Sequence, residues 1–229
     1  IHAENTDDVS LGFVYIADGT FSIVADGDGI SSGADQQILN GTFSITAGGG
    51  SGEAATASFP TEAEPSASSS EEDATSTKGI KASGNLTIQS GTFTIDSADD
   101  AIHSNSDIVL SSGTYQITTG DDGVHADGAV QITGGTLAIA QSYEGIEGLT
   151  IEISGGEISV IASDDGLNAV GGADGSGTGS RGDSFSANAD AWITISGGVL
   201  SIDAEGDGID SNGSITINGG RILTMSVTS

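Results

Sequence analysis

Cysteine is absent from this chain of 229 residues, and Lys and Arg (4 together), Pro (2) and Trp (1) are scarce. Without cysteine there is no disulfide, no zinc–thiolate site and no cysteine nucleophile. The 33 Asp and Glu give a formal charge of −29, so the chain offers no positive patch to nucleic acid. No apolar run approaches the roughly 18 residues of a membrane span. We therefore expect neither a nucleic-acid partner nor a membrane span.

Two sequence markers repeat with one period. An acidic residue, a small residue and an aliphatic residue recur with the acid at positions 100, 122, 144, 165 and 207, at intervals of 22, 22, 21 and 42 residues. A turn glycine keeps the same phase at Gly19, Gly41, Gly91, Gly113, Gly135, Gly156, Gly198 and Gly220. Low hydrophobicity with high charge is typical of disorder, but a fixed period of this length indicates a solenoid instead.

Within each repeat, apolar residues alternate with polar ones, as in Ile108-Val109-Leu110 and Tyr115-Gln116-Ile117. Period two predicts β-strands, three short ones per repeat, each followed by turn residues. One 22-residue coil cannot bury its apolar side alone, so the coils must stack. We predict an all-β, right-handed, three-sheeted parallel β-helix of about eight coils, about 38 Å long at about 4.8 Å per coil. Tyr115, in the slot of Phe93, is predicted to lie in the core.

We expect residues 1–229 to form a single domain with two loop insertions, at 47–76 and 170–189. Both interrupt the period, and both are rich in Ser, Gly or acidic residues. The last strand is barely finished at Ser229, and an open solenoid end needs covering. We therefore expect a piece of a longer chain, or a partner packed on the end.

Stacking turns the recurring acids into a row along one corner, where like charges about 4.8 Å apart repel. Exposure on splayed turns, protonation, capping by backbone N–H groups or bound divalent cations would each relieve the repulsion. Ca²⁺ takes six to eight oxygens from carboxylates and carbonyls, which acidic turns on adjacent coils can supply, so calcium is the favoured cofactor. The predicted ligands form three sets along the corner: Asp99, Asp100, Asp121 and Asp122; Glu144, Asp164 and Asp165; Glu205, Asp207 and Asp210.

The turns Asp121–Ala126 and Asp99–Ser104, followed by strands such as Ser90–Ile95, resemble those of the clostridial carbohydrate-binding β-helix proteins. The resemblance covers nearly the whole chain outside the insertions. It implies a fold like that of polysaccharide lyases, Ca²⁺ on turn aspartates, and binding of cellulose and pectic polysaccharide. Calcium ligation then falls on Asp99, Asp100, Asp121, Asp122, Asp164 and Asp165. Thr77-Lys78 and Tyr143-Glu144 depart from the pattern, which predicts an interrupted metal row.

The favoured function is calcium-dependent, non-catalytic binding of an extended plant cell-wall polysaccharide, cellulose or pectate, at the flat faces of the β-helix. Trp192, Tyr143 and Tyr15 are the outward aromatic candidates for sugar stacking. One alternative is a polysaccharide lyase with Lys78 or Lys81 as its base, although Lys78 could equally form an ion pair in the acidic row. A structural stalk or adhesin is the other alternative. A glycoside hydrolase is disfavoured because the acids recur in every coil.

Two further motifs were considered. His103 and His125 share a slot on adjacent coils and could bind a transition metal, but a solvated surface is the favoured interpretation because the slot is polar and variable. Arg181-Gly182-Asp183 has the sequence of an integrin-type adhesion tripeptide. A match of only three residues often occurs by chance, so we give it little weight. The lack of cysteine, the two lysines, the polar composition and the resemblance together predict a secreted or cell-surface protein.

Overall fold

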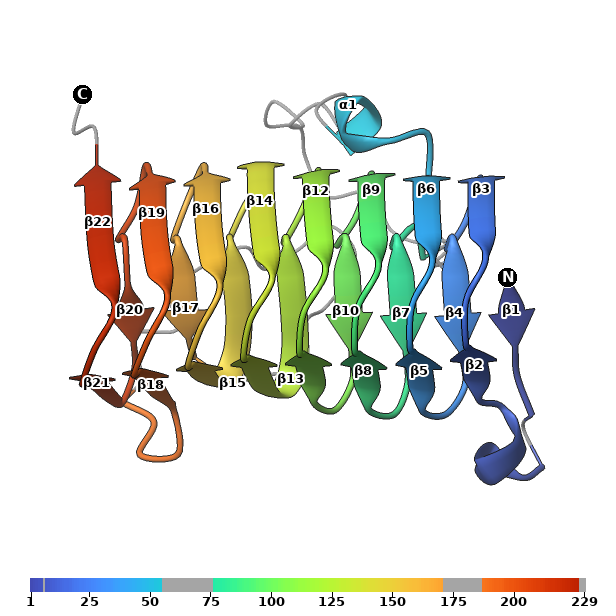
Figure 1. Cartoon of the computed structure of the whole chain (residues 1–229), viewed down its shortest axis with the longest axis horizontal. Coiled ribbons are helices and arrows are strands. Elements are labelled where there is room, and N and C mark those ends of the chain that lie inside the picture. Colours follow the sequence, from blue (N-terminus) through green and yellow to red (C-terminus); the bar gives the residue numbers. More distant parts are fainter. Residues whose placement is uncertain (6, 55–75, 171–186, 227–229) are drawn as a thin grey trace, which may run out of the picture.

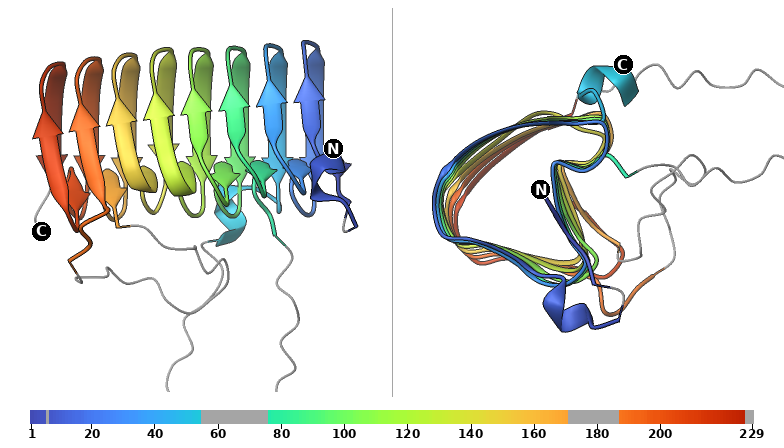
Figure 2. Two further views of the ribbon diagram at one scale, coloured as in Figure 1. Left: turned by 90° about the horizontal axis from the view of Figure 1, so that it is seen from below. Right: turned by 90° about the vertical axis from the view of Figure 1, so that its right-hand side faces the viewer.

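The chain winds into a stack of parallel β-strands in the computed structural model, which describes residues 1–5, 7–54, 76–170 and 187–226 (Figure 1). Viewed along the stack, successive coils superpose on nearly the same outline (Figure 2). The predicted all-β architecture with parallel strands is therefore confirmed. Neither described helix is long and apolar enough to traverse a bilayer.

An 8-stranded sheet forms one side of the stack, with one strand from each coil. Its strands, in stacking order, are β3 (Thr20–Ala25), β6 (Thr42–Ala47), β9 (Thr92–Ser97), β12 (Thr114–Thr119), β14 (Thr136–Gln141), β16 (Glu157–Ala162), β19 (Val199–Ala204) and β22 (Arg221–Ser226). Thr42 pairs with Thr92, and Glu157 pairs with Val199. The strands before and after each long insertion are therefore direct neighbours in the sheet.

The other 14 strands form one sheet made of two rows. The first row contains β1 (His2–Ala3), β4 (Ile30–Ser32), β7 (Ile80–Ala82), β10 (Ile102–Ser104), β17 (Leu167–Ala169) and β20 (Asp210–Ser211). The second contains β2 (Val14–Ile16), β5 (Gln36–Ile38), β8 (Leu86–Ile88), β11 (Ile108–Leu110), β18 (Trp192–Ile195) and β21 (Ser214–Ile217). Two longer strands, β13 (Val124–Ile132) and β15 (Ile146–Ile153), pair with both rows and so join them.

Two short helices lie outside the stack, η1 (Val9–Leu11) and α1 (Ser51–Ala54). The helix α1 follows β6 directly, inside the first insertion predicted from the sequence (Figure 1). Its four residues complete little more than one turn, which is too short for a hydrophobic period to be visible in the sequence.

Equivalent apolar residues of successive coils form continuous ladders in the core. The rings of Phe21, Phe43, Phe93 and Tyr115 stack with centroids 4.7–4.9 Å apart and planes within 7° of parallel. Tyr115 is buried, as predicted, and its hydroxyl donates a hydrogen bond to the carbonyl of Ser112 at 2.8 Å. These ladders fix the register from coil to coil, and thereby the positions of the polar side chains at the corners.

Glycine serves two separate purposes in the repeat. The predicted turn glycines all have φ between 86° and 145°, which is accessible to glycine and strained for other residues. Gly123, in the acidic corner, is required for a different reason: a Cβ there would lie 2.5 Å from Ile139 Cδ1 and 2.6 Å from the carbonyl oxygen of Gly145. The chain at this corner therefore packs directly against the next coil.

Candidate functional site

The acidic corner is largely buried in the middle of the stack. Asp100, Asp122, Glu144 and Asp165 are each at most 7% exposed, and Lys78 occupies the same position one coil before Asp100. The column comprises Asp28, Lys78, Asp100, Asp122, Glu144, Asp165 and Asp207. Of the sequence-based explanations, exposure on splayed turns therefore does not apply to the four central acids. Asp207, at the end of the column, is exposed.

Carboxylates in this column accept hydrogen bonds from the backbone of the following coil. Asp100 Oδ1 accepts from the N–H of Asp122 at 3.1 Å, and Asp122 Oδ1 accepts from the N–H of Glu144 at 3.0 Å. The same bond joins Asp28 to Lys78 and Asp165 to Asp207. Because a buried N–H needs an acceptor, the acidic residue at this position first serves the fold. We refer to these bonds as the carboxylate–backbone ladder.

Lys78 provides the counter-charge for the N-terminal part of the column. Its Nζ lies 2.5 Å from Asp100 Oδ2 and 3.0 Å from Asp99 Oδ1, and its side chain is 1% exposed. Burial alone would lower the pKa of Lys78, but the charges of Asp100 and Asp99 outweigh that and raise it above its ordinary value. Burial opposes ionisation of Asp100, yet Lys78 and His103 hold the pKa of its carboxyl well below the usual range. Both groups are therefore charged at neutral pH.

Three of the four residues in one predicted calcium set come together in space, while the fourth, Asp122, lies in a different group. Carboxylate oxygens of Asp99, Asp100 and Asp121 lie within 4.8 Å of one another. Three of the four oxygens of Asp99 and Asp100 already accept bonds, from Lys78, from His103 or from backbone N–H groups. Ca²⁺ needs six to eight oxygens and is repelled by an ammonium group among them. The residues present therefore fit Ca²⁺ poorly while Lys78 keeps its position.

The other two predicted calcium sets do not form such clusters within the residues that the structure describes. Asp165 is buried and its Oδ1 accepts from the N–H of Asp207, while Asp164 is partly exposed. In the last set, Glu205 and Asp207 are exposed and Asp210 is partly buried in β20. Burial and the nearby charge of Glu147 raise the pKa of Glu144 to about 9.

The solvated surface expected for His103 and His125 is wrong, because both rings are buried, at 2% and 1% exposure. They stack on each other with centroids 5.1 Å apart. The Nδ1 atom of each ring contacts the aspartate three residues earlier, His103 to Asp100 at 2.8 Å and His125 to Asp122 at 3.1 Å. The slot is polar because it faces the column of acids, not because it faces water.

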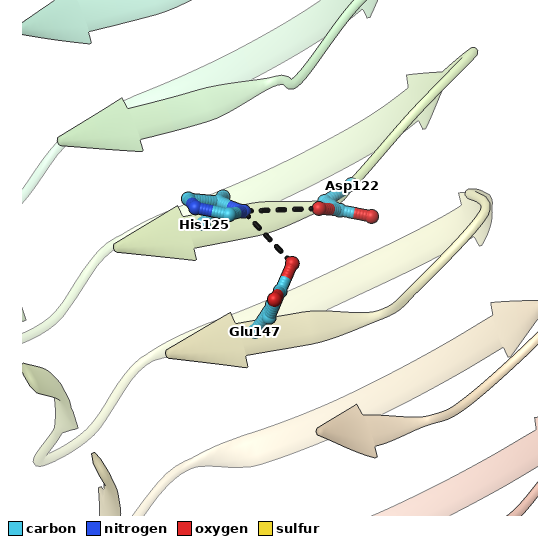
Figure 3. A group of neighbouring side chains, drawn as sticks. All are labelled: Asp122, His125 and Glu147. Carbon is cyan, nitrogen blue, oxygen red and sulfur yellow. Dashed lines mark hydrogen bonds and ion pairs between the residues drawn. The ribbon is translucent and has the colours of Figure 1, made fainter. Parts of the chain in front are cut away.

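A second group of potential ligands surrounds His125 (Figure 3). Its Nδ1 also lies 2.9 Å from Glu147 Oε2, and the donor atoms of Asp122, His125 and Glu147 all lie within 4.8 Å of one another. Burial raises the pKa of Asp122 well above the ordinary value, and Asp100 and Glu144 add to this. Burial would lower the pKa of His125, but the neighbouring carboxylates of Asp122, Asp127 and Glu147 raise it above its ordinary range. Asp122 and His125 therefore both hold their protons more tightly than usual, because the pKa of each is raised.

The sequence places Glu147 near the acidic column and in the same slot as His125, but Asp122, His125 and Glu147 were not combined into one group of ligands. The signal was present: Asp-x-x-His occurs at residues 100–103 and again at 122–125, and a step of 22 residues takes His125 to Glu147. The corner column and the histidine slot are separated by two residues in each of these coils. Their proximity across the turn becomes evident only once both are known to be buried.

The predicted sugar-binding aromatics lie in different environments. Tyr15, in β2, is 54% exposed, Trp192 is partly exposed at the start of β18, and Tyr143 is partly exposed in the acidic turn. Phe13, which the sequence analysis did not single out, is 54% exposed beside Tyr15. The two rings line an open groove of about 840 Å³ together with Ser10, Asp35 and Gln37. Arg181-Gly182-Asp183 lies outside the described residues.

An all-β stack of this kind, with an outward groove that combines aromatic and polar side chains, has the features of a ligand-binding solenoid. A family model described as "Carbohydrate-binding domain-containing protein" matches residues 1–123 and 125–228, and the chain belongs to this family. Among solved structures it is similar to a polysaccharide lyase-like protein from C. thermocellum, determined as a gadolinium derivative. The identity is 18% and the TM-score 0.43, over 98% of this chain and 90% of that chain. No curated protein matches the chain.

Proposed function

We propose that this protein binds an extended polysaccharide outside the cell, on the outer face of the strand row that runs from β2 to β18, and does not cleave it. The observation that carries the proposal is the family match, which spans almost every coil. Because the match is not confined to one loop or one end, it supports a ligand that contacts the stack itself. A repeating surface of this kind suits a repeating polymer.

The chemistry of this face supports a polysaccharide ligand. One outward column passes from Tyr15 through six further coils, and its members are partly or fully exposed: Tyr15, Gln37, Thr87, Val109, Gln131, Glu152 and Thr194. Six steps of about 4.8 Å give a surface about 29 Å long. Phe13 and Tyr15 lie at one end and Trp192 at the other, so apolar rings flank a stretch of amides and hydroxyls. Rings and hydrogen-bonding groups together match the apolar faces and hydroxyl edges of sugars.

Charge favours a neutral polymer. This column contains Glu152 and no Lys or Arg, Asp35 lines the groove beside it, and the whole chain carries a charge of −29. An anionic chain such as pectate would be repelled unless cations bridged it to the protein. A neutral polysaccharide of the cellulose type is therefore the favoured ligand.

A lyase role is disfavoured by the surroundings of the two candidate bases. Lys78 is buried and its ammonium group is held by Asp99 and Asp100, so it is neither deprotonated nor accessible to a substrate. Lys81 Nζ donates to Ser76 Oγ at 3.1 Å and lies 4.0 Å from Asp28 Oδ2. The carboxylate–backbone ladder likewise commits corner acids to structural bonds. These arrangements support binding without cleavage.

Sedimentation with insoluble polysaccharide tests this proposal. We expect the protein to be retained on cellulose, with less retention on calcium pectate, and to release no unsaturated uronide detectable by ultraviolet absorbance. Absence of retention on both polymers would point to the structural stalk instead. Product absorbance that is lost in Lys81→Ala would establish the lyase.

Calcium dependence stays a prediction, and the binding proposed here does not require it. If Ca²⁺ binds at Asp99, Asp100 and Asp121, it must displace the ammonium group of Lys78. Thermal unfolding with Ca²⁺ and with EDTA then gives a sharp comparison: the rise in Tm with Ca²⁺ should be larger in Lys78→Gln than in the unmodified protein. An equal rise in both proteins would show that the ion binds elsewhere.

We also infer that the three rows of strands are the sides of a right-handed parallel β-helix. Crossover connections between parallel strands are right-handed in nearly all known cases, and the short uniform coils support the same winding here. A secreted or cell-surface location belongs to the proposal too, since an extracellular polysaccharide is reached only there.

A further inference from the structure

We propose that Asp122, His125 and Glu147 form a binding site for a divalent transition metal, with Zn²⁺ as the favoured ion. Asp127 would not bind the metal itself but would accept a hydrogen bond from the other ring nitrogen of His125. The inference concerns the protein itself and does not depend on the proposed polysaccharide binding. It differs from the calcium site expected from the sequence in its residues, its donor atoms and its burial.

The donor atoms are already close enough to share one ion. His125 Nδ1 lies 3.1 Å from Asp122 Oδ2 and 2.9 Å from Glu147 Oε2. Ligands bonded to Zn²⁺ at about 2.0–2.2 Å in a tetrahedron lie about 3.3–3.6 Å apart, so these two distances need to lengthen by only a few tenths of an ångström, while the donor atoms of Asp122 and Glu147 lie within 4.8 Å of each other. One imidazole nitrogen with two carboxylates is a zinc-type donor set, whereas Ca²⁺ prefers oxygen alone. Three protein ligands leave a fourth position for water.

Two orphaned atoms behind the histidine provide an independent observation. His125 Nε2 and Asp127 Oδ1 are buried, have no hydrogen-bond partner, and lie 3.6 Å from each other. When a metal binds at Nδ1, the imidazole proton resides on Nε2, and a carboxylate at that position is its usual acceptor. A small rotation of the ring would join the two atoms. Asp127 is thus placed as the outer carboxylate of a metal-bound histidine.

The preceding coil provides an internal comparison. There Asp100 and His103 occupy the positions of Asp122 and His125, and the ammonium group of Lys78 lies against Asp100. In the His125 coil the position one coil before Asp122 is Asp100, an acid, and Glu144 and Glu147 lie in the coil that follows. Glu144 Oε2 is also buried without a partner. Buried carboxylates without enough counter-charge are strongly unfavourable, and a divalent cation would supply what Lys78 supplies one coil earlier.

The ion would have a route to the site. The side chains of Glu147 and Asp127 are 17% and 22% exposed, whereas His125 is 1% exposed. The two acidic groups therefore connect the buried nitrogen with solvent. The metal would link the coil of Asp122 and His125 to the coil of Glu147 and so stabilise the middle of the stack.

Titration calorimetry of the metal-free full chain with ZnCl₂ tests the site, and Co²⁺ absorption reports the nitrogen ligand. We expect one equivalent of Zn²⁺ to bind. Asp127→Asn should weaken binding by roughly 10- to 100-fold, as losses of outer partners usually do, and His125→Gln should weaken it more. His103→Gln is the matched control, since it removes the equivalent imidazole from the coil that Lys78 compensates, and should leave Zn²⁺ affinity unchanged.

Circular dichroism of each variant separates loss of binding from loss of fold. If His125→Gln does not fold, Glu147→Gln carries the test, because that side chain is partly exposed and its loss leaves the coil packing intact. Zn²⁺ bound no more tightly than Mg²⁺, or bound equally well by Glu147→Gln, would overturn the proposal. The cluster would then be an ion pair of protonated His125 with its two carboxylates.

Discussion

Lys78 Nζ lies 2.5 Å from Asp100 Oδ2, in a column of corner residues whose other members are all acidic. The single lysine at this position pairs with Asp100 and Asp99 and so relieves the repulsion in the N-terminal part of the column. The same contact makes Lys78 unsuitable as a catalytic base and places an ammonium group where the sequence predicted calcium. The contact between Lys78 and Asp100 therefore stabilises the fold, opposes calcium binding at this position and disfavours a lyase activity that uses Lys78.

Replacing Lys78 by Met should lower the free energy of unfolding by about 3–5 kcal/mol, because it leaves Asp100 buried without a counter-charge. Urea denaturation followed by circular dichroism measures the change. Lys81→Met is the matched control: its side chain is 25% exposed and its ammonium group lies 4.0 Å from Asp28 Oδ2, so the change should stay below about 1 kcal/mol. Equal effects of the two substitutions would contradict the role assigned to Lys78.

The stability of the metal-free protein should decline between about pH 5 and pH 9. Burial raises the pKa of Glu144 to about 9 in the folded state, above its ordinary value of 4.5. The unfolded chain therefore releases this proton first, and each further pH unit favours unfolding by up to about 1.4 kcal/mol until the folded group also ionises. Urea unfolding at several pH values in EDTA should show a shallower decline for Glu144→Gln. An unchanged slope would mean that Glu144 is ionised in the folded protein.

The groove rings should contribute measurably to polysaccharide binding. Phe13→Ala and Tyr15→Ala should each weaken retention on cellulose by roughly 2- to 10-fold, equivalent to about 0.5–1.5 kcal/mol for one aromatic contact. Val24→Ala provides the control, because Val24 is 83% exposed on β3, in the other sheet. Depletion isotherms with a fixed amount of cellulose give the comparison. A loss in Val24→Ala as large as that in Tyr15→Ala would move the binding face to the 8-stranded sheet.

Within the aromatic ladder, the position in the stack should decide the effect of a substitution. Phe43 is 1% exposed between Phe21 and Phe93, and Phe43→Ala should lower the free energy of unfolding by about 3–5 kcal/mol. Phe21, at the end of the ladder and only partly buried, should be affected less by the same change. Thermal and urea unfolding of both variants test this, and a larger effect at Phe21 would be inconsistent with the stacking order.

The sequence predicted the parallel stack well because the register is encoded by period alone. Ile102 pairs with Val124 and Phe93 stacks on Tyr115, and both pairs are 22 residues apart. The direction of the corner side chains was not predictable in the same way. Inside a strand, side chains alternate between the inner and the outer face, so their direction can be predicted from the sequence. The chain bends between Asp122 and His125, and the alternation cannot be carried through that bend.

Polarity misled the interpretation of the histidine slot for a related reason. Ser31, Lys81, Glu147 and Asn168 occupy equivalent positions, and such a mixture is typical of a surface. In this fold a polar slot is buried because a column of acids lies across the corner from it. Asn168 Nδ2, for example, donates to Glu144 Oε1 at 2.8 Å. Only the spatial relationship between the two columns reveals this.

The carboxylate–backbone ladder gives the molecule a polarity along its long axis. Each aspartate receives an N–H from the segment that follows it in the chain, so a finished turn offers a prepared docking point for the one synthesised next. If the coils fold in the order in which the ribosome delivers them, the carboxylate acceptor of each of these bonds is in place before its N–H donor arrives.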